Sequence, residues 1–230
     1  MNKQERYNQK TDVYTKELNK PIIEQVTKGA KVLDVGCGNG RMGEYLIKNN
    51  QNKVTGIDIS QPAIDQAKKV LSEAYCLDLQ KDAMPFSEKS FEIIICGDIL
   101  EHLFDPLSIL KILSKYLKDD GFFLLSIPNV ANIFIRLSLL KGNFNYQESG
   151  ILDETHLRFF TLETIKKMLE QAGLKIVTLQ GTRTGYGEEI GSFQKAVHRA
   201  LFYNPLEAFL RKHWLIKLLS TQFIIKAKVK

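Results

Sequence analysis

The stretch VLDVGCGNG, residues 32–40, constrains the fold of this chain more than any other part of its sequence. A run of strand-forming residues ends in glycines at three alternate positions, Gly36, Gly38 and Gly40, and a helical pattern follows. Glycine adopts positive φ without strain and lets a ligand approach the backbone closely. The stretch therefore predicts a buried strand, a tight turn and a helix, with a ligand bound at the turn.

Six further strand-like runs follow, and most of them are separated by helical patterns. The seven predicted strands are residues 31–36, 53–59, 74–79, 91–97, 121–128, 174–179 and 222–229. Ser60, Asp105 and Thr161 stand where helix N-caps are expected, and Gly173 ends the last predicted helix. Strands that alternate with helices of about 10–15 residues predict an α/β fold with a parallel sheet and crossover helices.

Two longer segments interrupt this alternation, residues 129–160 and 181–219. We expect both to be excursions on the substrate side or at an interface, covering an edge or the carboxyl end of the sheet. The second excursion is predicted to form two amphipathic helices, broken at Asn204-Pro205, with Val197 and Leu201 on the first and Leu206, Phe209, Leu210 and Trp214 on the second. With an N-terminal helical cap over residues 1–30, the chain 1–230 is interpreted as one domain.

The composition is that of an ordinary globular protein, with 44% hydrophobic and 25% charged residues. No apolar run reaches the roughly 18 residues of a membrane helix, and the N-terminus is polar. We therefore expect a cytoplasmic protein without a signal peptide or a membrane span. Cys37, Cys76 and Cys96 lack CxxC spacing, and we interpret them as reduced thiols rather than a zinc site.

The net charge of +6 is concentrated in residues 193–230, which hold eight Lys or Arg and one Glu. We interpret this segment as a solvated helix face or a contact with a second subunit, as in a homodimer. Peripheral contact with a membrane surface is the alternative. Nucleic acid is not an expected partner, because residues 1–192 are slightly acidic and carry no base-clamping Asn-Pro-Pro-Tyr string.

Acidic residues at the ends of the next two predicted strands indicate which ligand the glycine turn holds. Asp58 ends one strand, and a carboxylate there can accept hydrogen bonds from ribose hydroxyls. Asp78 follows the next strand, where it can accept from an adenine amino group. The spacing GxGxG differs from the GxGxxG of dinucleotide-binding turns. An adenosine without phosphates fits these features. Helix-end or loop roles for the two acids remain alternatives.

Taken in order, VLDVGCGNGRMGEYL, GIDIS, LDLQ, MPFSEKSFEIIICGDILEHL and GFFLLSIPN resemble the motifs of class I S-adenosylmethionine-dependent methyltransferases. The resemblance covers roughly residues 10–180. It implies a Rossmann-like seven-stranded sheet of order 3-2-1-4-5-7-6, with strand 7 antiparallel, helices on both faces and a helical insertion between the last two strands. S-adenosylmethionine would be the cofactor.

The resemblance also implies a role for each residue of the donor site. The methionine part of the donor would lie on Asp34 and on the turn Gly36, Cys37, Gly38 and Gly40. Its ribose would be bound by Asp58 and its adenine by Asp78, Ile59 and Leu79. The end of the fourth strand, at Cys96 and Gly97, would line the other side of the donor.

Two strings of polar residues point to the methyl acceptor. In GDILEHL, a helical turn beginning at Asp98 would place Asp98, Glu101 and His102 on one face. The string ILDETHLRFF, residues 151–160, adds Asp153, His156 and Arg158. Together with SIPN, this string resembles bacterial small-molecule and sugar O-methyltransferases, including those related to the ubiquinone pathway. The resemblance implies methylation of a hydroxyl on a small molecule or glycan.

We expect Asp98, Glu101, His102 and His156 to converge beside the methyl group of the donor. Two carboxylates and two imidazoles suit Mg²⁺, Mn²⁺ or Zn²⁺, although an Asp at the first position has a shorter reach than a Glu. Without a metal ion, His102 or His156 is the candidate general base. A purely structural cluster is the third alternative.

Two other classes of function remain open at this stage. A non-catalytic S-adenosylmethionine-binding protein would keep Asp58 and the glycines, but it would not need Asp98, Glu101 and His102. An NAD(P)-linked oxidoreductase would need GxGxxG and usually a Tyr-x-x-x-Lys pair, neither of which we find.

Overall fold

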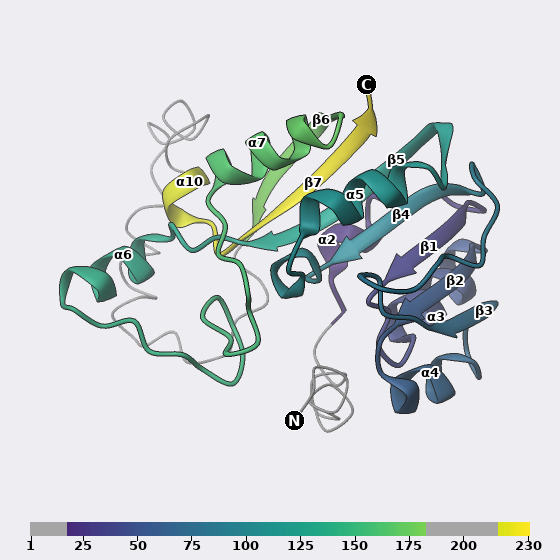
Figure 1. Cartoon of the computed structure of the whole chain (residues 1–230), viewed down its shortest axis with the longest axis horizontal. Coiled ribbons are helices and arrows are strands. Elements are labelled where there is room, and N and C mark those ends of the chain that lie inside the picture. The colour runs from purple at the N-terminus through teal and green to yellow at the C-terminus, as the bar shows by residue number, and fades with distance from the viewer. Residues whose placement is uncertain (1–17, 183–215) are drawn as a thin grey trace.

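The computed structural model describes residues 18–182 and 216–230, and these form a seven-stranded sheet of order β3-β2-β1-β4-β5-β7-β6 (Figure 1). β7 is antiparallel to both β5 and β6, and the other neighbours are parallel. The strands are β1 (Lys31–Val35), β2 (Lys53–Asp58), β3 (Glu73–Cys76), β4 (Phe91–Gly97), β5 (Leu117–Pro128), β6 (Leu174–Thr182) and β7 (Gln222–Val229). The expected strand order and the direction of the last strand are confirmed.

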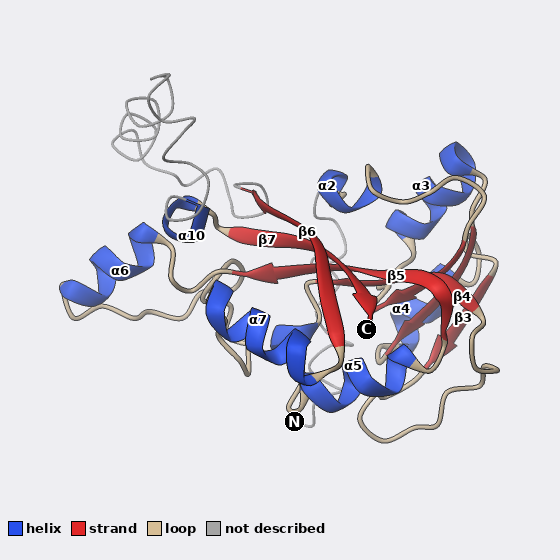
Figure 2. Cartoon of the chain, turned by 90° about the horizontal axis from the view of Figure 1, so that it is seen from above, coloured by secondary structure: helices blue, strands red, loops and turns tan. Residues whose placement is uncertain are grey.

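Helices cover both faces of the sheet, α2 and α3 lying on one side and α5 and α7 on the other (Figure 2). The helices are α2 (Lys20–Ile23), α3 (Arg41–Asn50), α4 (Gln61–Ala67), the short 3-10 helix η2 (Leu100–His102), α5 (Pro106–Ser114), α6 (Ile133–Leu140), α7 (Leu162–Gln171) and α10 (Ile216–Leu219). Val32 of β1 packs toward α2, α3 and α4, whereas its neighbour Leu33 packs toward α5 and α7. Two buried faces explain why the central strands are almost continuously apolar.

The predicted helix caps are present. The side chains of Ser60, Asp105 and Thr161 accept hydrogen bonds from the backbone three residues later, at 3.4, 3.1 and 3.3 Å. Gly173, with φ of +75°, follows α7 as expected. These local signals fix where the helices begin and end, and so where the connecting loops leave the sheet.

The excursion after β5 contains α6 and a long loop that extends away from the sheet (Figure 1). Two buried asparagines at its start hold it against the chain that enters β7. The side-chain amide of Asn129 donates to the carbonyls of Lys217 and Ser220, and that of Asn132 donates to those of Leu219 and Ser220. The asparagine of the SIPN string therefore has a structural role.

Several expectations fall outside the described residues. These are the two amphipathic helices around Asn204-Pro205, most of the basic segment 193–230 and the first part of the N-terminal cap. Within the described residues, Lys217 pairs with Glu163, Lys230 lies 3.9 Å from Glu170, and the Lys226 ammonium lies 3.7 Å from the centre of the Phe122 ring. No helix among the described residues is long and apolar enough to cross a membrane.

Candidate active site

The glycine turn is tightly tied to β2. Gly36, Gly38 and Gly40 all have positive φ, at 75°, 54° and 84°. The backbone N–H groups of Gly36 and Cys37 donate to the carbonyl of Ile57 at 2.8 and 3.1 Å. The next N–H, that of Gly38, donates to a carboxylate oxygen of Asp58 at 2.9 Å. The turn is therefore held open in a conformation that glycine alone adopts without strain.

Asp34 is buried in β1 beside this turn, with 2% of its surface exposed. Its Oδ2 atom makes no hydrogen bond. Burial, with a smaller contribution from the charge of Asp58, raises the pKa of Asp34 to about 7. A buried carboxylate oxygen without a partner is costly. A cationic group bound at the turn would relieve that cost, and the ammonium of a methionine moiety is such a group.

Asp58 accepts hydrogen bonds from the protein backbone, in addition to its predicted contact with ribose. Its oxygens accept from the N–H of Gly38 and from the N–H of Ser60, each at 2.9 Å. Burial raises its pKa, and these backbone hydrogen bonds oppose that rise. A carboxylate oxygen accepts more than one hydrogen bond, so ribose hydroxyls can still be bound. Asp58 thus supports the turn and the start of α4, and its contact with a ribose stays a prediction.

Asp78 organises the loop after β3, which ends at Cys76 rather than at residue 79. Its carboxylate accepts from the N–H of Gln80 at 3.1 Å and lies 3.1 Å from the ammonium of Lys81. Its own N–H donates to Asp82 at 2.7 Å. The loop role that we kept as an alternative is therefore present, and a contact with adenine stays a prediction.

The remaining predicted donor residues differ in what they present to a ligand. Cys37 is directed inward, since a Cβ added to Gly56 would lie 2.6 Å from its sulfur, and Cys96 is fully buried in the core. Contacts from these two residues therefore fall to their backbone atoms. Gly97 ends β4, while Ile59 and Leu79 are half-buried at the carboxyl ends of β2 and β3.

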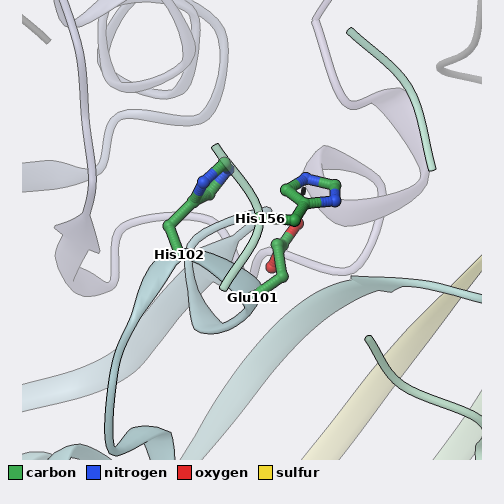
Figure 3. A group of neighbouring side chains, drawn as sticks. All are labelled: Glu101, His102 and His156. Carbon is green, nitrogen blue, oxygen red and sulfur yellow. Dashed lines mark ion pairs between the residues drawn. The ribbon is translucent and has the colours of Figure 1, made fainter. Parts of the chain in front are cut away.

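Three of the four predicted acceptor-side residues come together after β4. Glu101 and His102 lie on η2, and His156 reaches them from the segment after α6 (Figure 3). One ligand atom from each of the three lies within 4.8 Å of the others. The two imidazole centres are 4.7 Å apart, and His156 Nε2 lies 4.0 Å from Glu101 Oε1. We call these three residues the acceptor cluster.

Backbone hydrogen bonds dock the segment of His156 onto η2. The N–H groups of Leu157 and Arg158 both donate to the carbonyl of Glu101, at 2.9 and 3.0 Å. The Arg158 guanidinium donates to the carbonyl of Phe104 through Nε and Nη2, at 3.1 and 2.7 Å. These contacts explain why residues 55 positions apart in sequence, Glu101 and His156, share one site.

Asp98 does not belong to the acceptor cluster, and the expected helical turn beginning at this residue is wrong. The backbone of Asp98 is left-handed, with φ of 53°, and the helical turn starts only at Leu100. Its N–H donates to Ser126, and its carboxylate accepts from the side-chain amide of Gln222 on β7. Asp98 is therefore directed toward β5 and β7, and the four predicted residues do not form one cluster of metal ligands.

The acceptor cluster lies next to the glycine turn. β1 and β4 are neighbours, with Val35 paired to Cys96, so both sites follow the carboxyl ends of adjacent strands. Ile99, which precedes η2, packs directly on the turn, because a Cβ added to Gly36 would lie 3.0 Å from Ile99 Cδ1. Ile99 was not predicted as a site residue, because an apolar residue beside a strand does not indicate a contact with the glycine turn.

Comparisons with known proteins identify the family. Residues 5–179 match the model of the family described as methyltransferase domain. The chain is 33% identical over 175 residues to the ubiquinone biosynthesis O-methyltransferase of Coxiella burnetii, covering 70% of this chain and 71% of that one. It is 26% identical over 192 residues to that of Idiomarina loihiensis, covering 79% and 69%.

Solved structures share the fold at low sequence identity. A SAM-dependent methyltransferase from Archaeoglobus fulgidus has a TM-score of 0.59 at 18% identity, covering 98% of this chain and 94% of that one. The cyclase SpnF has a TM-score of 0.62 at 19% identity, covering 91% and 79%. The chain belongs to the methyltransferase domain family, as a class I S-adenosylmethionine-dependent methyltransferase. The cyclase shows that the fold alone does not determine the reaction.

Proposed function

We propose that this methyltransferase transfers the methyl group of S-adenosylmethionine to a hydroxyl of a small-molecule acceptor. The observation that carries the proposal is the position of the acceptor cluster after β4, where Glu101 and His156 are buried, His102 is half-buried and Ile99 contacts the glycine turn. The Coxiella and Idiomarina relatives are both ubiquinone biosynthesis O-methyltransferases, which supports the choice of oxygen as the acceptor atom.

The donor supplies an activated methyl group, so this chain has to align the acceptor and manage its proton. Alignment alone is worth about 7–11 kcal/mol in well-oriented reactions. In the proposed site, Asp34 and the glycine turn would hold the methionine part of the donor, and Asp58 and Asp78 its ribose and adenine. The donor would supply its methyl group to the acceptor oxygen, with the C–S bond broken as the O–C bond forms, and His102 or His156 would take the hydroxyl proton.

An aromatic group beside the acceptor cluster supports a ring-bearing acceptor. The ring of Phe159 lies 6.2 Å from that of His156, and it packs against Phe144 at 5.5 Å and Tyr146 at 6.2 Å. Tyr146 is 59% exposed, so this group reaches the surface. Aromatic faces receive both aromatic rings and the C–H faces of sugars. A phenol or another small alcohol is the first candidate, and a glycan hydroxyl the second.

The acceptor cluster also fits a divalent cation. Two imidazoles and a carboxylate are suitable ligands, and a bound ion would lower the pKa of a coordinated hydroxyl. Ligand atoms bonded to one ion at about 2.1 Å lie no more than about 4.2 Å apart. The three ligand atoms lie within 4.8 Å of one another, which is close to that spacing. Glu101, His102 and His156 would hold the ion.

A methyl-transfer screen tests the proposal. The protein is incubated with methyl-labelled S-adenosylmethionine and cell-extract fractions, alongside panels of phenols, aliphatic alcohols and sugars. We expect a labelled ether that requires the protein. Repeating the assay with a chelator, and then with Mg²⁺, Mn²⁺ or Zn²⁺ restored, separates an ion from a histidine base. Tight donor binding without any labelled product would instead support the non-catalytic alternative.

A further inference from the structure

A buried threonine controls the direction of hydrogen bonds around His102. Thr155 and Asp153 are 5% and 6% exposed. The hydroxyl oxygen of Thr155 lies 2.6 Å from Asp153 Oδ1 and 3.3 Å from His102 Nδ1. The backbone N–H of Thr155 donates to the same Asp153 oxygen at 2.8 Å. Asp153 Oδ1 accepts from both groups of Thr155, so the hydroxyl proton of Thr155 is directed at Asp153.

The proton on the imidazole of His102 follows from this arrangement. With its own proton committed, the Thr155 hydroxyl can only accept from Nδ1. The second neighbour of Nδ1 is the carbonyl oxygen of Thr155 at 3.2 Å, which also only accepts. Both neighbours therefore require a proton on Nδ1. In a neutral imidazole, the lone pair then lies on Nε2.

His156 is held in the same way by the same short segment. Its Nδ1 lies 3.0 Å from the carbonyl oxygen of Ile151, an acceptor, so Nδ1 carries the proton here too. The Nε2 atom of His156 faces Glu101 at 4.0 Å. Residues 151–155 thus set the tautomer of both histidines, although they contribute no side chain to the acceptor cluster.

We infer that Thr155, held by Asp153, is a positioning residue that keeps the lone pair of His102 on Nε2. The inference rests on the proposed function for its effect on turnover, because a proton acceptor and a metal ligand both need that lone pair. The tautomer of His102 itself depends neither on a bound methyl acceptor nor on a bound metal ion. It can therefore be measured whether or not a methyl acceptor is known.

The tautomers are tested by long-range ¹H–¹⁵N correlation spectra of the imidazoles in the full ¹⁵N-labelled chain. The chain has four histidines, and spectra of His102→Gln and His156→Gln assign the two that matter. In spectra recorded over a pH series, the neutral form of each ring is expected to carry its proton on Nδ1. A proton on Nε2 of neutral His102 would overturn the inference.

Three variants test the hydroxyl. Thr155→Val keeps the shape and removes the hydroxyl, Thr155→Ser restores it, and Thr178→Val on β6 is the matched control. The Thr155 carbonyl, which Thr155→Val keeps, still accepts from His102 Nδ1, so we expect only a minor population of the Nε2-protonated tautomer to appear at His102, with His156 unchanged. Turnover should fall by about 10- to 100-fold at unchanged KM for the donor, the range typical of such supporting partners. Thr155→Ser and Thr178→Val should resemble the wild type.

The outcomes separate this inference from the proposed function. If Thr155→Val keeps both the wild-type spectrum and the wild-type turnover, or if Thr155→Ser falls as far as Thr155→Val, Thr155 has no positioning role. If no acceptor is methylated by any form of the protein while the spectra change as expected, the proposed function fails and the positioning of His102 stands.

Discussion

The proposed donor side and the proposed acceptor side of this site are built by different means. The glycine turn and its two acids lie within residues 34–58, and positive φ angles and backbone hydrogen bonds to β2 fix their geometry. The acceptor cluster instead joins η2 to a loop some fifty residues later, and it depends on how residues 151–158 dock. The first is a local backbone structure, and the second is a tertiary contact. Changes to one side should therefore leave measurable properties of the other intact.

The largest expected effect comes from removing an imidazole. His102→Ala or His156→Ala should lower turnover by about 10²- to 10⁴-fold, the usual contribution of a general acid or base. Affinity for the donor, measured by calorimetry, should stay at the wild-type value, because the glycine turn is untouched. Wild-type turnover in both variants would show that the acceptor cluster has only a structural role.

Asp58→Ala should act on the donor side. Buried ribose hydroxyls would lose a charged acceptor, and two backbone N–H groups would lose their partner. We expect donor affinity to fall by about 1.5–3 kcal/mol, together with a lower melting temperature. Asp65→Ala, at an exposed position on α4, is the control. Equal donor affinity in calorimetry for the Asp58 variant and the wild type would contradict donor binding at this turn.

Asp34 predicts a pH dependence confined to the donor side. Its pKa in the donor-free protein is about 7, raised mainly by burial. The fold thus favours the neutral acid, and the free energy of unfolding should fall as pH rises from about 4 to about 7. Ammonium binding favours the ionised form, so donor affinity should rise up to about tenfold per pH unit below 7 and then level off.

The control for this titration is Asp34→Asn, whose donor affinity should vary little between about pH 5.5 and 7.5. Calorimetry in two buffers of different ionisation enthalpy measures the proton released by the wild type on binding. A wild-type affinity that is flat over this range would contradict an ionised Asp34 in the complex.

The smallest effect tests the contact between Gly36 and Ile99, which joins the two sides. Gly36 and Gly29 have nearly equal positive φ, 75° and 72°, but an added Cβ meets Ile99 at Gly36 and nothing within 4 Å at Gly29. Each change to Ala should cost about 1–2 kcal/mol of backbone strain. Only Gly36→Ala should also lower turnover, and Ile99→Val should partly restore it. Equal turnover in the two glycine variants would show that the sides are not coupled through Ile99.

Much of the fold could be predicted because its signals are local. The apolar run of β4 matches the observed strand, Phe91–Gly97, and side-chain caps mark three helix starts. β5, however, begins at Leu117 rather than at residue 121. Its first residues, LKDD, have no strand pattern, and they join the sheet because Leu117 pairs with Phe91 across an irregularity in register. The strand order came from the resemblance to a family and not from periodicity.

The acceptor side was predictable in part. Glu101, His102 and His156 carry recognisable chemistry, whereas the position of Asp98 depends on a left-handed backbone that nothing in its neighbourhood signals. The part played by Thr155 was missed, although an Asp two residues before a Thr is a known turn pattern. The hydroxyl of Thr155 reaches His102 only because the loop docks on η2. That docking is a tertiary contact.

The position of β7 between β5 and β6 has a consequence for how the chain is made. β1, β2, β3, β4 and β5 are complete by residue 128, but the edge of β5 pairs with residues 222–227 of β7. At about 5–20 residues per second, synthesis needs roughly 5–20 s to supply the β5 partners, residues 222–227. Throughout that interval a nascent strand with the apolar run Phe122–Ile127 has an unpaired edge, the kind of surface that invites aggregation. Chaperone demand during translation should therefore peak between the synthesis of β5 and that of β7.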